Sequence, residues 1–343
     1  MSDIDVCVIG LGRAGGFHLE SIRTLPGVRL ARVYDTDPDA AKGVAERTGC
    51  RIAESPADAV GSSDVDAVVV STPTHTHYEL VTAALSAGKP VLSEKPLGTN
   101  LAEIDHCFSL AGERAVPLLV AFQRRFDPSF ADAIRATREG ELGEVRFIRS
   151  VSRDHPIPSL DYLRTSGGIL HDCVVHDFDL VCQLAGEEPV EVFCFGSNFV
   201  PEIESIGDLD HLVVSLRFPS GLLASIDISR FGAHGYDQRV EVLGEKGMLQ
   251  TGNWPDTTAA VTTREGTRSA PIDYSFPTRY RDAYRLEFEC FLECVRGERE
   301  SPVTHDEVRL NHKLADAAYA SWEQGRPVEL LSLIHISEPT RPY

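Results

Sequence analysis

The stretch Asp5-Val-Cys-Val-Ile9-Gly10-Leu-Gly12-Arg13-Ala14-Gly15 decides how the start of the chain folds. Its first five residues form a short, nearly continuous apolar run, which is typical of a buried parallel strand. A G-x-G-x-x-G pattern follows at once, and apolar residues then recur at helical spacing from Phe17. The glycines therefore stand in the strand–turn–helix context that a dinucleotide-binding loop requires.

Each glycine of this loop has a separate expected role. Gly10 permits a tight turn, Gly12 lets a pyrophosphate approach the backbone, and Gly15 lets helix and strand pack closely. The N-terminus of the helix adds amide donors and a partial positive charge for the phosphates. We therefore predict that Gly10, Gly12 and Gly15 bind the cofactor, together with the intervening Arg13 and Ala14.

A second predicted strand, over residues 28–34, ends at Asp35, 20 residues beyond Gly15. This is the spacing expected of the acid that accepts from the ribose 2′-hydroxyl and repels a 2′-phosphate. Thr36 rather than an arginine follows it, and Asp37 adds negative charge. The sequence thus predicts NAD rather than NADP, the alternative being a surface acid in a β–α turn.

Strand and helix patterns alternate up to residue 122, with strands predicted over 66–71, 90–93 and 117–122 and helices over 38–48 and before Gly88. This alternation predicts an α/β fold whose N-terminal domain is a Rossmann-type, doubly wound parallel sheet. Ligands bind beyond the carboxyl ends of such strands. Six further cofactor-binding candidates follow strand ends: Thr72, Pro73, His75, His77, Glu94 and Lys95.

Beyond residue 122 the predicted strands become long and alternating, over residues 144–153, 190–199, 211–218, 222–230, 238–243 and 247–251. They predict a C-terminal α/β domain with a large, mostly antiparallel open sheet. One face of this sheet should be covered by helices, and the other is a candidate subunit interface. Amphipathic helices are predicted after the sheet, over 282–296 and 305–323. We expect domains at 1–122 and 123–330, with 331–343 a non-native or disordered tail.

Composition excludes several classes of protein. The 343 residues carry a formal charge of −19, which argues against a nucleic-acid partner and against docking on an anionic membrane. The first apolar run is too short for a signal peptide or a membrane span. The eight scattered cysteines form no CxxC pair, so free thiols in a reducing, cytoplasmic compartment are expected.

A second chemical stretch runs from Ser166 to Asp179, with the sequence Ser-Gly-Gly-Ile-Leu-His-Asp-Cys-Val-Val-His-Asp-Phe-Asp. Asp172 and His176 are four residues apart and share a face of a helix. A carboxylate beside an imidazole suits proton transfer, although a solvated or structural pair is the alternative. A metal site is disfavoured because His171 and His176, five apart, point to different faces, and no metal is expected.

Four motifs now occur in order: Gly10-x-Gly12-x-x-Gly15-x-x-His18, Thr72-Pro73-x-x-x-His77, Glu94-Lys95-Pro96 and Gly167-Gly168-x-x-x-Asp172-x-x-x-His176-Asp177. With them the chain resembles the Gfo/Idh/MocA oxidoreductases from about Ile4 to Leu330, and within that family it is most similar to inositol 2-dehydrogenases. The resemblance implies hydride transfer between NAD(P) and a polyol or sugar, and a homodimer or homotetramer.

By that resemblance Lys95 matches the catalytic lysine, and Asp172 and His176 match the acid–histidine pair, in a cleft between the two domains. Alcohol oxidation needs a group that accepts the hydroxyl proton. Lys95, with its pKa lowered by its surroundings, can take that proton; alternatively it stays charged and stabilises the alkoxide while His176 accepts the proton. The sequence leaves both schemes open.

Arg124, Arg153, Asp154 and Tyr236 are further substrate-binding candidates, beside Asp172 and His176. Two departures from the family pattern, Gln123 and the Asp154-His155-Pro156 turn, bear on which polyol is bound. The function expected is NAD-dependent oxidation of myo-inositol to 2-keto-myo-inositol (scyllo-inosose). The alternatives are another sugar or trans-dihydrodiol dehydrogenase on the same scaffold, or a non-catalytic NAD(P)-binding regulator.

Overall fold

The computed structural model of the chain describes residues 3–255 and 257–330. They form two compact units, the first made of residues 3–126 together with 281–312, and the second of the described residues of 127–280 together with 313–330. The chain therefore leaves the first unit and returns to it, unlike the two contiguous domains expected. The reason is α11 (Arg281–Val295), whose Phe288, Phe291 and Leu292 belong to the hydrophobic core of the first unit.

The first unit is built on a six-stranded sheet with the order β3-β2-β1-β4-β5-β6, in which every neighbouring pair is parallel. Its strands are β1 (Ile4–Ile9), β2 (Val28–Tyr34), β3 (Arg51–Ile52), β4 (Ala67–Val70), β5 (Val91–Glu94) and β6 (Leu118–Ala121). The connecting helices are α1 (Arg13–Thr24), α2 (Pro38–Thr48), α3 (Pro56–Gly61), α4 (His77–Ser86) and α5 (Leu101–Arg114). The predicted doubly wound parallel sheet is confirmed.

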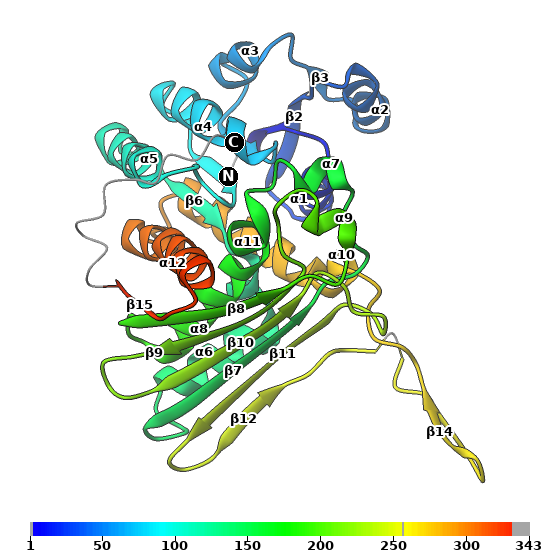
Figure 1. The fold of residues 1–343 in the computed structure, drawn as a ribbon. Helices are drawn as coiled ribbons and strands as arrows, with labels where there is room; N and C mark the ends of the chain where they lie inside the picture. The colour runs from blue at the N-terminus through cyan, green and yellow to red at the C-terminus, as the bar shows by residue number, and fades with distance from the viewer. Residues whose placement is uncertain (1–2, 256, 331–343) are drawn as a thin grey trace. The chain divides into compact units, whose positions relative to one another are not determined.

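The order of this sheet reverses between β1 and β4, which places the turn after β1 beside the turn after β4. Strands β4, β5 and β6 are buried throughout, as near-continuous apolar runs in parallel sheets require. Helices α3, α4 and α5 neighbour one another, whereas α1 packs with α11 (Figure 1). Ligands in such sheets bind at the reversal point, so the fold directs attention to Gly10 and Ser71.

Two elements of this unit were not predicted. β3 has only two residues, both exposed, and so carries no apolar run that a sequence pattern could show. α3 is a six-residue helix that begins at Pro56 after the N-cap Ser55, whose side chain accepts from the backbone N–H of Asp58. Both elements are stabilised by their place beside β2 rather than by their own periodicity.

The second unit contains a seven-stranded sheet with the order β12-β11-β7-β10-β9-β8-β15. Its strands are β7 (Val145–Arg153), β8 (Glu191–Ser197), β9 (His211–Arg217), β10 (Leu223–Ser229), β11 (Asp237–Gly244), β12 (Met248–Thr251) and β15 (Val328–Glu329). Only the central pair β7–β10 is parallel among the described strands of this sheet. The predicted large and mostly antiparallel sheet is therefore confirmed.

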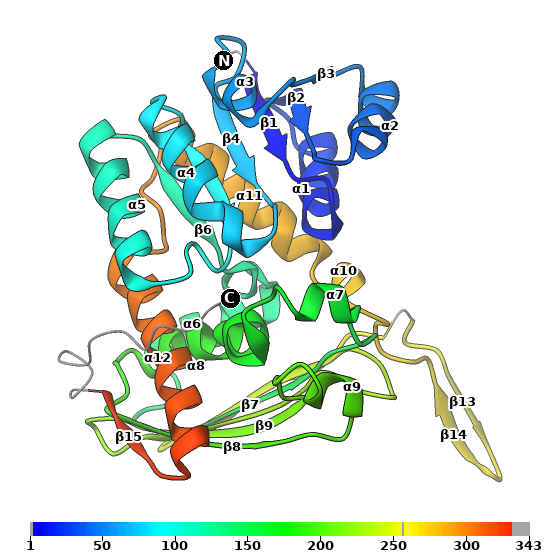
Figure 2. The ribbon, with the colours of Figure 1, turned by 45° about the horizontal axis from the view of Figure 1, so that its top comes forward.

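Helices lie on one face of this sheet. They include α6 (Pro128–Arg138), α8 (Val175–Ala185) and α12 (His305–Gln324), and the short helices of the unit are α7 (Leu160–Leu163), α9 (Pro201–Glu204) and α10 (Phe276–Arg279). In β7, Ile148 and Ser150 point to the covered face, where the Ser150 hydroxyl donates to Asp177 of α8 at 2.7 Å. Figure 2 shows α6 and α8 above the strands of this sheet.

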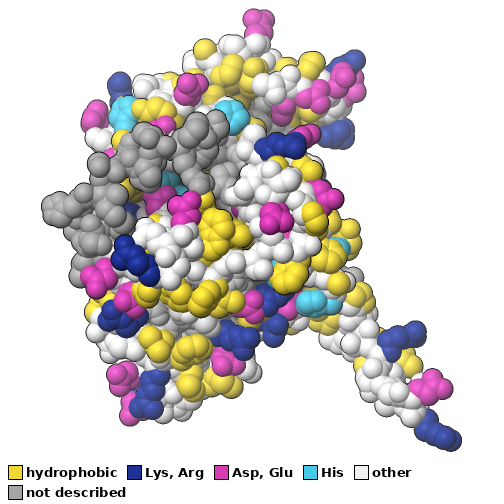
Figure 3. All heavy atoms as spheres, in the orientation of Figure 1, with side chains coloured by type: hydrophobic (Ala, Val, Ile, Leu, Met, Phe, Trp, Pro, Cys, Tyr) yellow, Lys and Arg dark blue, Asp and Glu magenta, His cyan; other side chains and the backbone are white. Residues whose placement is uncertain are grey.

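The opposite face of the sheet is open. Phe195, Val213 and Leu223 point outward there from three neighbouring strands, and their side chains are 64%, 45% and 48% exposed. Figure 3 shows hydrophobic side chains interspersed with charged ones over the lower part of this view. Such a half-apolar face differs from an ordinary solvated one and is typical of a covered surface.

A β-hairpin of β13 (Ala260–Thr263) and β14 (Gly266–Ser269) extends away from the rest of the second unit, and all eight of its strand residues are exposed (Figure 1). It was not predicted, because its strand sequences, Ala-Val-Thr-Thr and Gly-Thr-Arg-Ser, do not alternate apolar and polar residues. The expected tail at 331–343 lies outside the described residues. None of the helices in the described part of the chain combines the length and apolarity needed to cross a membrane.

Candidate active site

The glycine loop after β1 has the geometry of a diphosphate cradle. Gly10 has φ +91°, and a Cβ there would lie 2.6 Å from the carbonyl oxygen of Ser71, so only glycine fits. A Cβ at Gly15 would lie 2.1 Å from the carbonyl oxygen of Gly10, which explains why the helix can approach the strand so closely. A Cβ at Gly12 would meet no atom within 4 Å, so that position faces open space.

The first turn of α1 is suited to an anion. Gly12 is its N-cap and offers no side chain to the free backbone N–H groups, and no acidic residue stands in the first turn. Arg13 is exposed and Ala14 half-buried at the next two positions. Unsatisfied amides together with the helix dipole stabilise negative charge at such an end. The residues present therefore fit the pyrophosphate of a dinucleotide.

Asp35 follows β2, and its carboxylate is hydrogen-bonded to the backbone of the glycine loop. Its Oδ2 accepts a hydrogen bond from the backbone N–H of Leu11 at 2.6 Å, and its Oδ1 accepts one from Asp37 at 2.8 Å. A carboxylate has about four acceptor sites, so bonds to ribose hydroxyls remain possible. Asp35 thus has a role in the loop itself, which the spacing argument did not reveal.

The residues that follow β4 and β5 form two further loops. Thr72 is half-buried, Pro73 and His75 are exposed beside it, and a short 3₁₀ turn over Thr74–Thr76 leads into α4. His77 is buried, and its ring contacts backbone carbonyls of both loops. His75 therefore remains a cofactor candidate by position, whereas His77 points into the protein.

Glu94 and Lys95 differ in exposure although they are adjacent. Glu94 is buried, with its Oε1 3.0 Å from Nε2 of His18, and Lys95 is half-buried at the head of the cis Lys95–Pro96 peptide. Burial acts to raise the pKa of the Glu94 carboxyl, but the hydrogen bond to His18 and the charge interactions with His18, Lys95 and His77 outweigh it, so the pKa lies below its ordinary value. A buried carboxylate thus immediately precedes Lys95 in the chain.

Asp172 and His176 lie on one continuous helical segment of the second unit, but its first part is wider than an α-helix. Leu170–Val174 forms a π-helical turn (η3), and α8 continues from Val175. The sequence predicted a regular helix here. An extra residue per turn costs stability and is found mostly at functional sites, where it re-aims side chains. Asp172 is buried and His176 half-buried.

A hydrogen-bond network with the buried Arg230 at its centre fixes the Asp172 carboxylate. The Tyr162 hydroxyl donates to its Oδ1 at 2.7 Å, and Nη1 of Arg230 lies 3.2 Å from its Oδ2. Nη2 of the same guanidinium binds Asp208 at 2.9 Å, and Asp208 in turn accepts from the backbone N–H of Ile169 at 2.9 Å. The Arg230 side chain is completely buried, so one cation is shared by two carboxylates out of contact with water.

This network determines what Asp172 can do. The charge of Asp172, followed by burial, raises the pKa of the Tyr162 hydroxyl, which therefore stays protonated and remains a donor. A carboxylate with two fixed donors keeps its position and its charge. Asp172 is suited to orienting a neighbouring group or a substrate hydroxyl, and less suited to accepting a proton itself.

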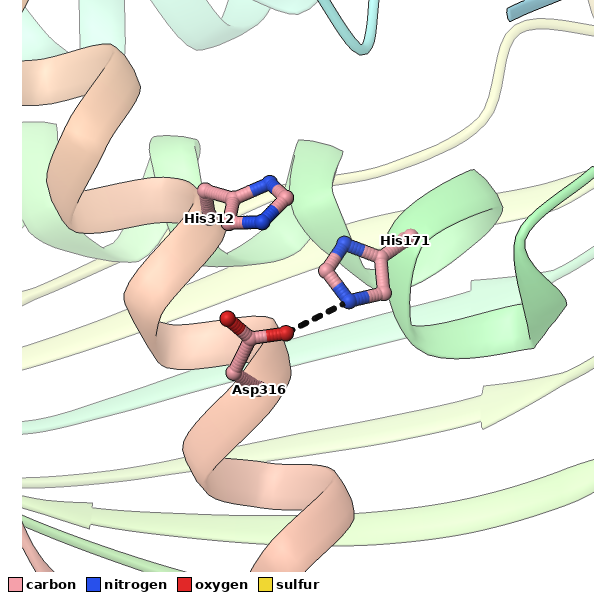
Figure 4. Close-up of side chains that lie close together, drawn as sticks. All are labelled: His171, His312 and Asp316. Carbon is pink, nitrogen blue, oxygen red and sulfur yellow. Dashed lines mark hydrogen bonds and ion pairs between the residues drawn. The ribbon is translucent and has the colours of Figure 1, made fainter. Parts of the chain in front are cut away.

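The other acidic and histidine residues of this stretch have structural contacts. Nε2 of His171 lies 3.0 Å from Oδ1 of Asp316 on α12; Figure 4 shows the pair, with His312 one turn earlier on the same helix. Asp177 accepts from Ser150 of the sheet, and Asp179 is buried. Residues that look alike in the sequence therefore divide into Asp172 and His176 on one hand and structural positions on the other.

The predicted substrate-binding residues are placed differently from one another. Arg124 is buried in the 3₁₀ turn η2 (Gln123–Phe126) of the first unit. In the second unit, Asp154 is half-buried after β7 and donates its backbone N–H to Ser229 at 2.8 Å. Tyr236 is buried and packs edge-on against Tyr280, with ring centroids 5.9 Å apart.

Arg153 has its contacts within the sheet. Its guanidinium binds the carbonyl of Asp227 at 2.6 Å and the carboxylate of the same residue. Ser150 and Ser152 point to the face covered by α8, and successive strand residues alternate. Arg153 therefore points to the open face of the sheet, away from the face that carries Asp172 and His176.

Sequence reasoning missed Tyr162, Asp208 and Arg230, and it named His18 in a motif without assigning it a role. A signal existed for Arg230, because Ala224, Ile226 and Ile228 occupy the covered face and the same alternation puts residue 230 there. A cation at a predicted buried position needs a buried acid, and Asp172 was a candidate. Tyr162 and Asp208 carried no such signal.

The first unit is a Rossmann unit with an NAD-type glycine loop and Asp35. The second unit carries an acid–histidine pair on a helix over an open sheet. The two sets of features together define a nicotinamide-dependent oxidoreductase. Family models agree: "Oxidoreductase family, NAD-binding Rossmann fold" matches residues 4–122, and "GFO/IDH/MocA C-terminal domain" matches residues 130–250. The chain belongs to the Gfo/Idh/MocA oxidoreductase family, and its cofactor is NAD.

Individual relatives span nearly the whole chain. The chain is 40% identical to myo-inositol 2-dehydrogenase of Thermotoga maritima, over 95% of this chain and 98% of the relative. It is 34% identical to scyllo-inositol 2-dehydrogenase (NAD(+)) of Bacillus subtilis, over 94% and 95%. A crystal structure of scyllo-inositol dehydrogenase from Lactobacillus casei, with bound NAD(H) and scyllo-inositol, superposes with a TM-score of 0.90 at 28% identity, over 96% of this chain and all of that one.

Proposed function

We propose that this protein oxidises myo-inositol at C2 to 2-keto-myo-inositol (scyllo-inosose) with NAD. The observation that carries the proposal is the near-complete match to inositol 2-dehydrogenases, together with the retention of Lys95, Asp172 and His176. A regulator without activity on this scaffold would be expected to have lost the lysine or the histidine.

In the proposed reaction, the residues of this chain bind the polyol and manage one proton. The nicotinamide of NAD accepts the hydride. In one scheme Lys95 takes the hydroxyl proton itself. In the other, Lys95 stays charged and stabilises the developing alkoxide while His176 accepts the proton. Asp172, held by Tyr162 and Arg230, orients the imidazole or a substrate hydroxyl.

The cofactor residues have distinct proposed roles. The amides at the start of α1, with Gly10, Gly12 and Gly15, would hold the pyrophosphate, and Asp35 would hold the adenosine ribose. Arg13, Ala14, Thr72, Pro73 and His75 would border the cofactor, and Glu94 would support Lys95. A carboxylate at residue 35 repels a 2′-phosphate, which supports NAD over NADP.

Arg124 and Asp154 are proposed to contribute to polyol specificity, since Gln123 beside Arg124 and the Asp154-His155-Pro156 turn depart from the expected family pattern. The experiment is a turnover assay of purified protein with NAD or NADP against myo-inositol, scyllo-inositol, aldoses and trans-dihydrodiols. The proposal expects turnover of myo-inositol with NAD and identification of the ketone by mass spectrometry. Oxidation of scyllo-inositol alone, or of a dihydrodiol alone, would replace the proposed substrate, and no turnover of any polyol would refute the proposal.

The open sheet face supports a further proposal, that the protein is a homodimer or homotetramer in the cytoplasm. Phe195, Val213 and Leu223 would be covered by a second copy of the same face. All eight cysteines are free, as expected in a reducing compartment. Light scattering of the eluted protein measures the oligomer; a monomer at micromolar concentration would contradict the interface, and Val213→Glu is expected to dissociate it.

A further inference from the structure

His77 has an unusual environment at the start of α4. It is 1% exposed, and both of its ring nitrogens lie against backbone carbonyl oxygens. Nδ1 is 2.7 Å from the oxygen of Pro96, and Nε2 is 2.7 Å from the oxygen of Thr72. One side chain therefore contacts the loop that follows β4 and the loop that follows β5.

Both carbonyls can only accept hydrogen bonds, and a neutral imidazole has a single N–H to donate. Two full hydrogen bonds require both nitrogens to be protonated. Burial lowers the pKa of His77, while the two carbonyls and the carboxylate of Glu94 act in the opposite direction and Lys95 adds to the lowering. In either protonation state the ring fills the space between the two loops and bonds to at least one of them.

The two loops carry different parts of the proposed machinery. Thr72 and Pro73 are cofactor-bordering candidates, and Pro96 directly follows Lys95. The peptide oxygen of Pro96 is therefore one residue away from the proposed catalytic lysine. The contact with His77 fixes the Pro96 carbonyl on one side of Lys95. On the other side of Lys95, Glu94 is held by His18, with Oε1 and Nε2 3.0 Å apart.

We propose that His77 is a positioning residue that ties the Lys95 loop to the Thr72 loop through the Pro96 and Thr72 carbonyls, and so sets the place of the lysine relative to the bound nicotinamide. The inference rests on the proposed roles of Lys95 and Thr72. This positioning role takes the place of the cofactor-binding role expected for His77 from the sequence, since both ring nitrogens contact backbone carbonyls of the protein. Misplacing a catalytic group by an ångström costs on the order of 10²-fold in rate.

Two conservative variants separate the two contacts. The amide nitrogen of asparagine reaches about as far as Nδ1 and can keep the bond to Pro96, whereas that of glutamine reaches about as far as Nε2 and can keep the bond to Thr72. His77→Gln is therefore expected to lower kcat by about 10- to 10²-fold with little change in the Kd for NAD. His77→Asn is expected to weaken NAD binding and to preserve more of kcat. His77→Ala should lose both.

The experiment measures kcat, KM for the polyol and the Kd for NAD of the full chain, with thermal unfolding of each variant. His106→Ala is the matched control, because its Nδ1 bonds the Tyr78 hydroxyl at 2.7 Å outside both loops. A lowered Tm with kcat and Kd within twofold of the parent in all three variants would overturn the proposal. If the parent protein turns over no polyol, the proposed function fails separately, and NAD binding by His77→Asn still tests the bond to Thr72.

Discussion

Glu287 provides a test of the first unit's core that is independent of activity. It lies on α11 with a completely buried side chain, and neither carboxyl oxygen has a hydrogen-bond partner among the described residues. Burial, and then the nearby charge of Glu94, raise the pKa of Glu287 well above its ordinary value. The folded protein therefore holds this carboxyl in its neutral form.

The consequence for stability has a definite sign. In the unfolded chain Glu287 ionises above a pH of about 4.3, whereas in the folded protein it keeps its proton. The stability that the raised pKa provides is fully present below that pH, and it is lost as the pH rises toward the folded pKa, by about 1.4 kcal/mol per pH unit. For a carboxyl that keeps its proton in the folded protein up to pH 7, the loss between about pH 5 and pH 7 amounts to roughly 2–3 kcal/mol.

The perturbation is Glu287→Gln, which keeps the shape and abolishes the titration. Its buried amide hydrogens add a cost that does not change with pH, so the informative quantity is the difference in stability between variant and parent at each pH. That difference should increase in favour of the variant by roughly 2–3 kcal/mol from pH 5 to pH 7, or about 4–10 °C in Tm.

Thermal and urea unfolding at several pH values measure this difference. Glu289→Gln is the matched control, on the same helix but half-exposed and 3.3 Å from Arg285. Its difference from the parent should stay small at every pH, since exposed pairs contribute little. A Glu287→Gln difference that is the same at pH 5 and pH 7 would show that Glu287 is ionised in the folded protein and would refute the reasoning.

Three further predictions concern the site. Lys95→Ala should lower turnover by about 10²–10⁴-fold and leave NAD binding nearly intact, as isothermal titration would show; near-normal turnover would remove Lys95 from the mechanism. Asp35→Ser should raise the preference for NADP over NAD by about tenfold, equivalent to about 1.4 kcal/mol. It should also weaken NAD binding, because two loop hydrogen bonds are lost. An unchanged ratio of the kcat/KM values for NADP and NAD would count against the role of Asp35. Arg230→Leu should destabilise the second unit by about 3–5 kcal/mol and lower kcat, because Asp172 and Asp208 lose their shared cation; equal stability to the parent would mean that the network is solvated.

Most of the fold was predictable because its signals are local. Continuous apolar runs such as Val6–Ile9 followed by glycines indicate parallel strands, and the alternation in residues 211–217 indicates a half-buried antiparallel one. The return of α11 to the first unit was not predictable in this way. Its amphipathic pattern shows that one face is buried, but not against which unit.

The candidate site divides along the same line. Gly10, Gly12, Gly15 and Asp35 have fixed spacings within one strand–helix–strand unit, so the sequence alone placed them. The support of Asp172 by Tyr162 and Arg230 joins residues 10 and 58 positions away, and such contacts depend on the packing of the whole unit. The face to which Arg153 points could not be predicted from spacing, because a single step along a strand changes the face to which a side chain points.

The central claim, hydride transfer from C2 of myo-inositol to NAD, is tested most directly with substrate deuterated at that carbon. Mass spectrometry of the reduced cofactor formed in a single turnover measures where the label goes. Direct hydride transfer places one deuterium in the nicotinamide ring of NADH and leaves none at the ketone carbon. Unlabelled NADH, or no reduction of NAD by myo-inositol, would contradict it.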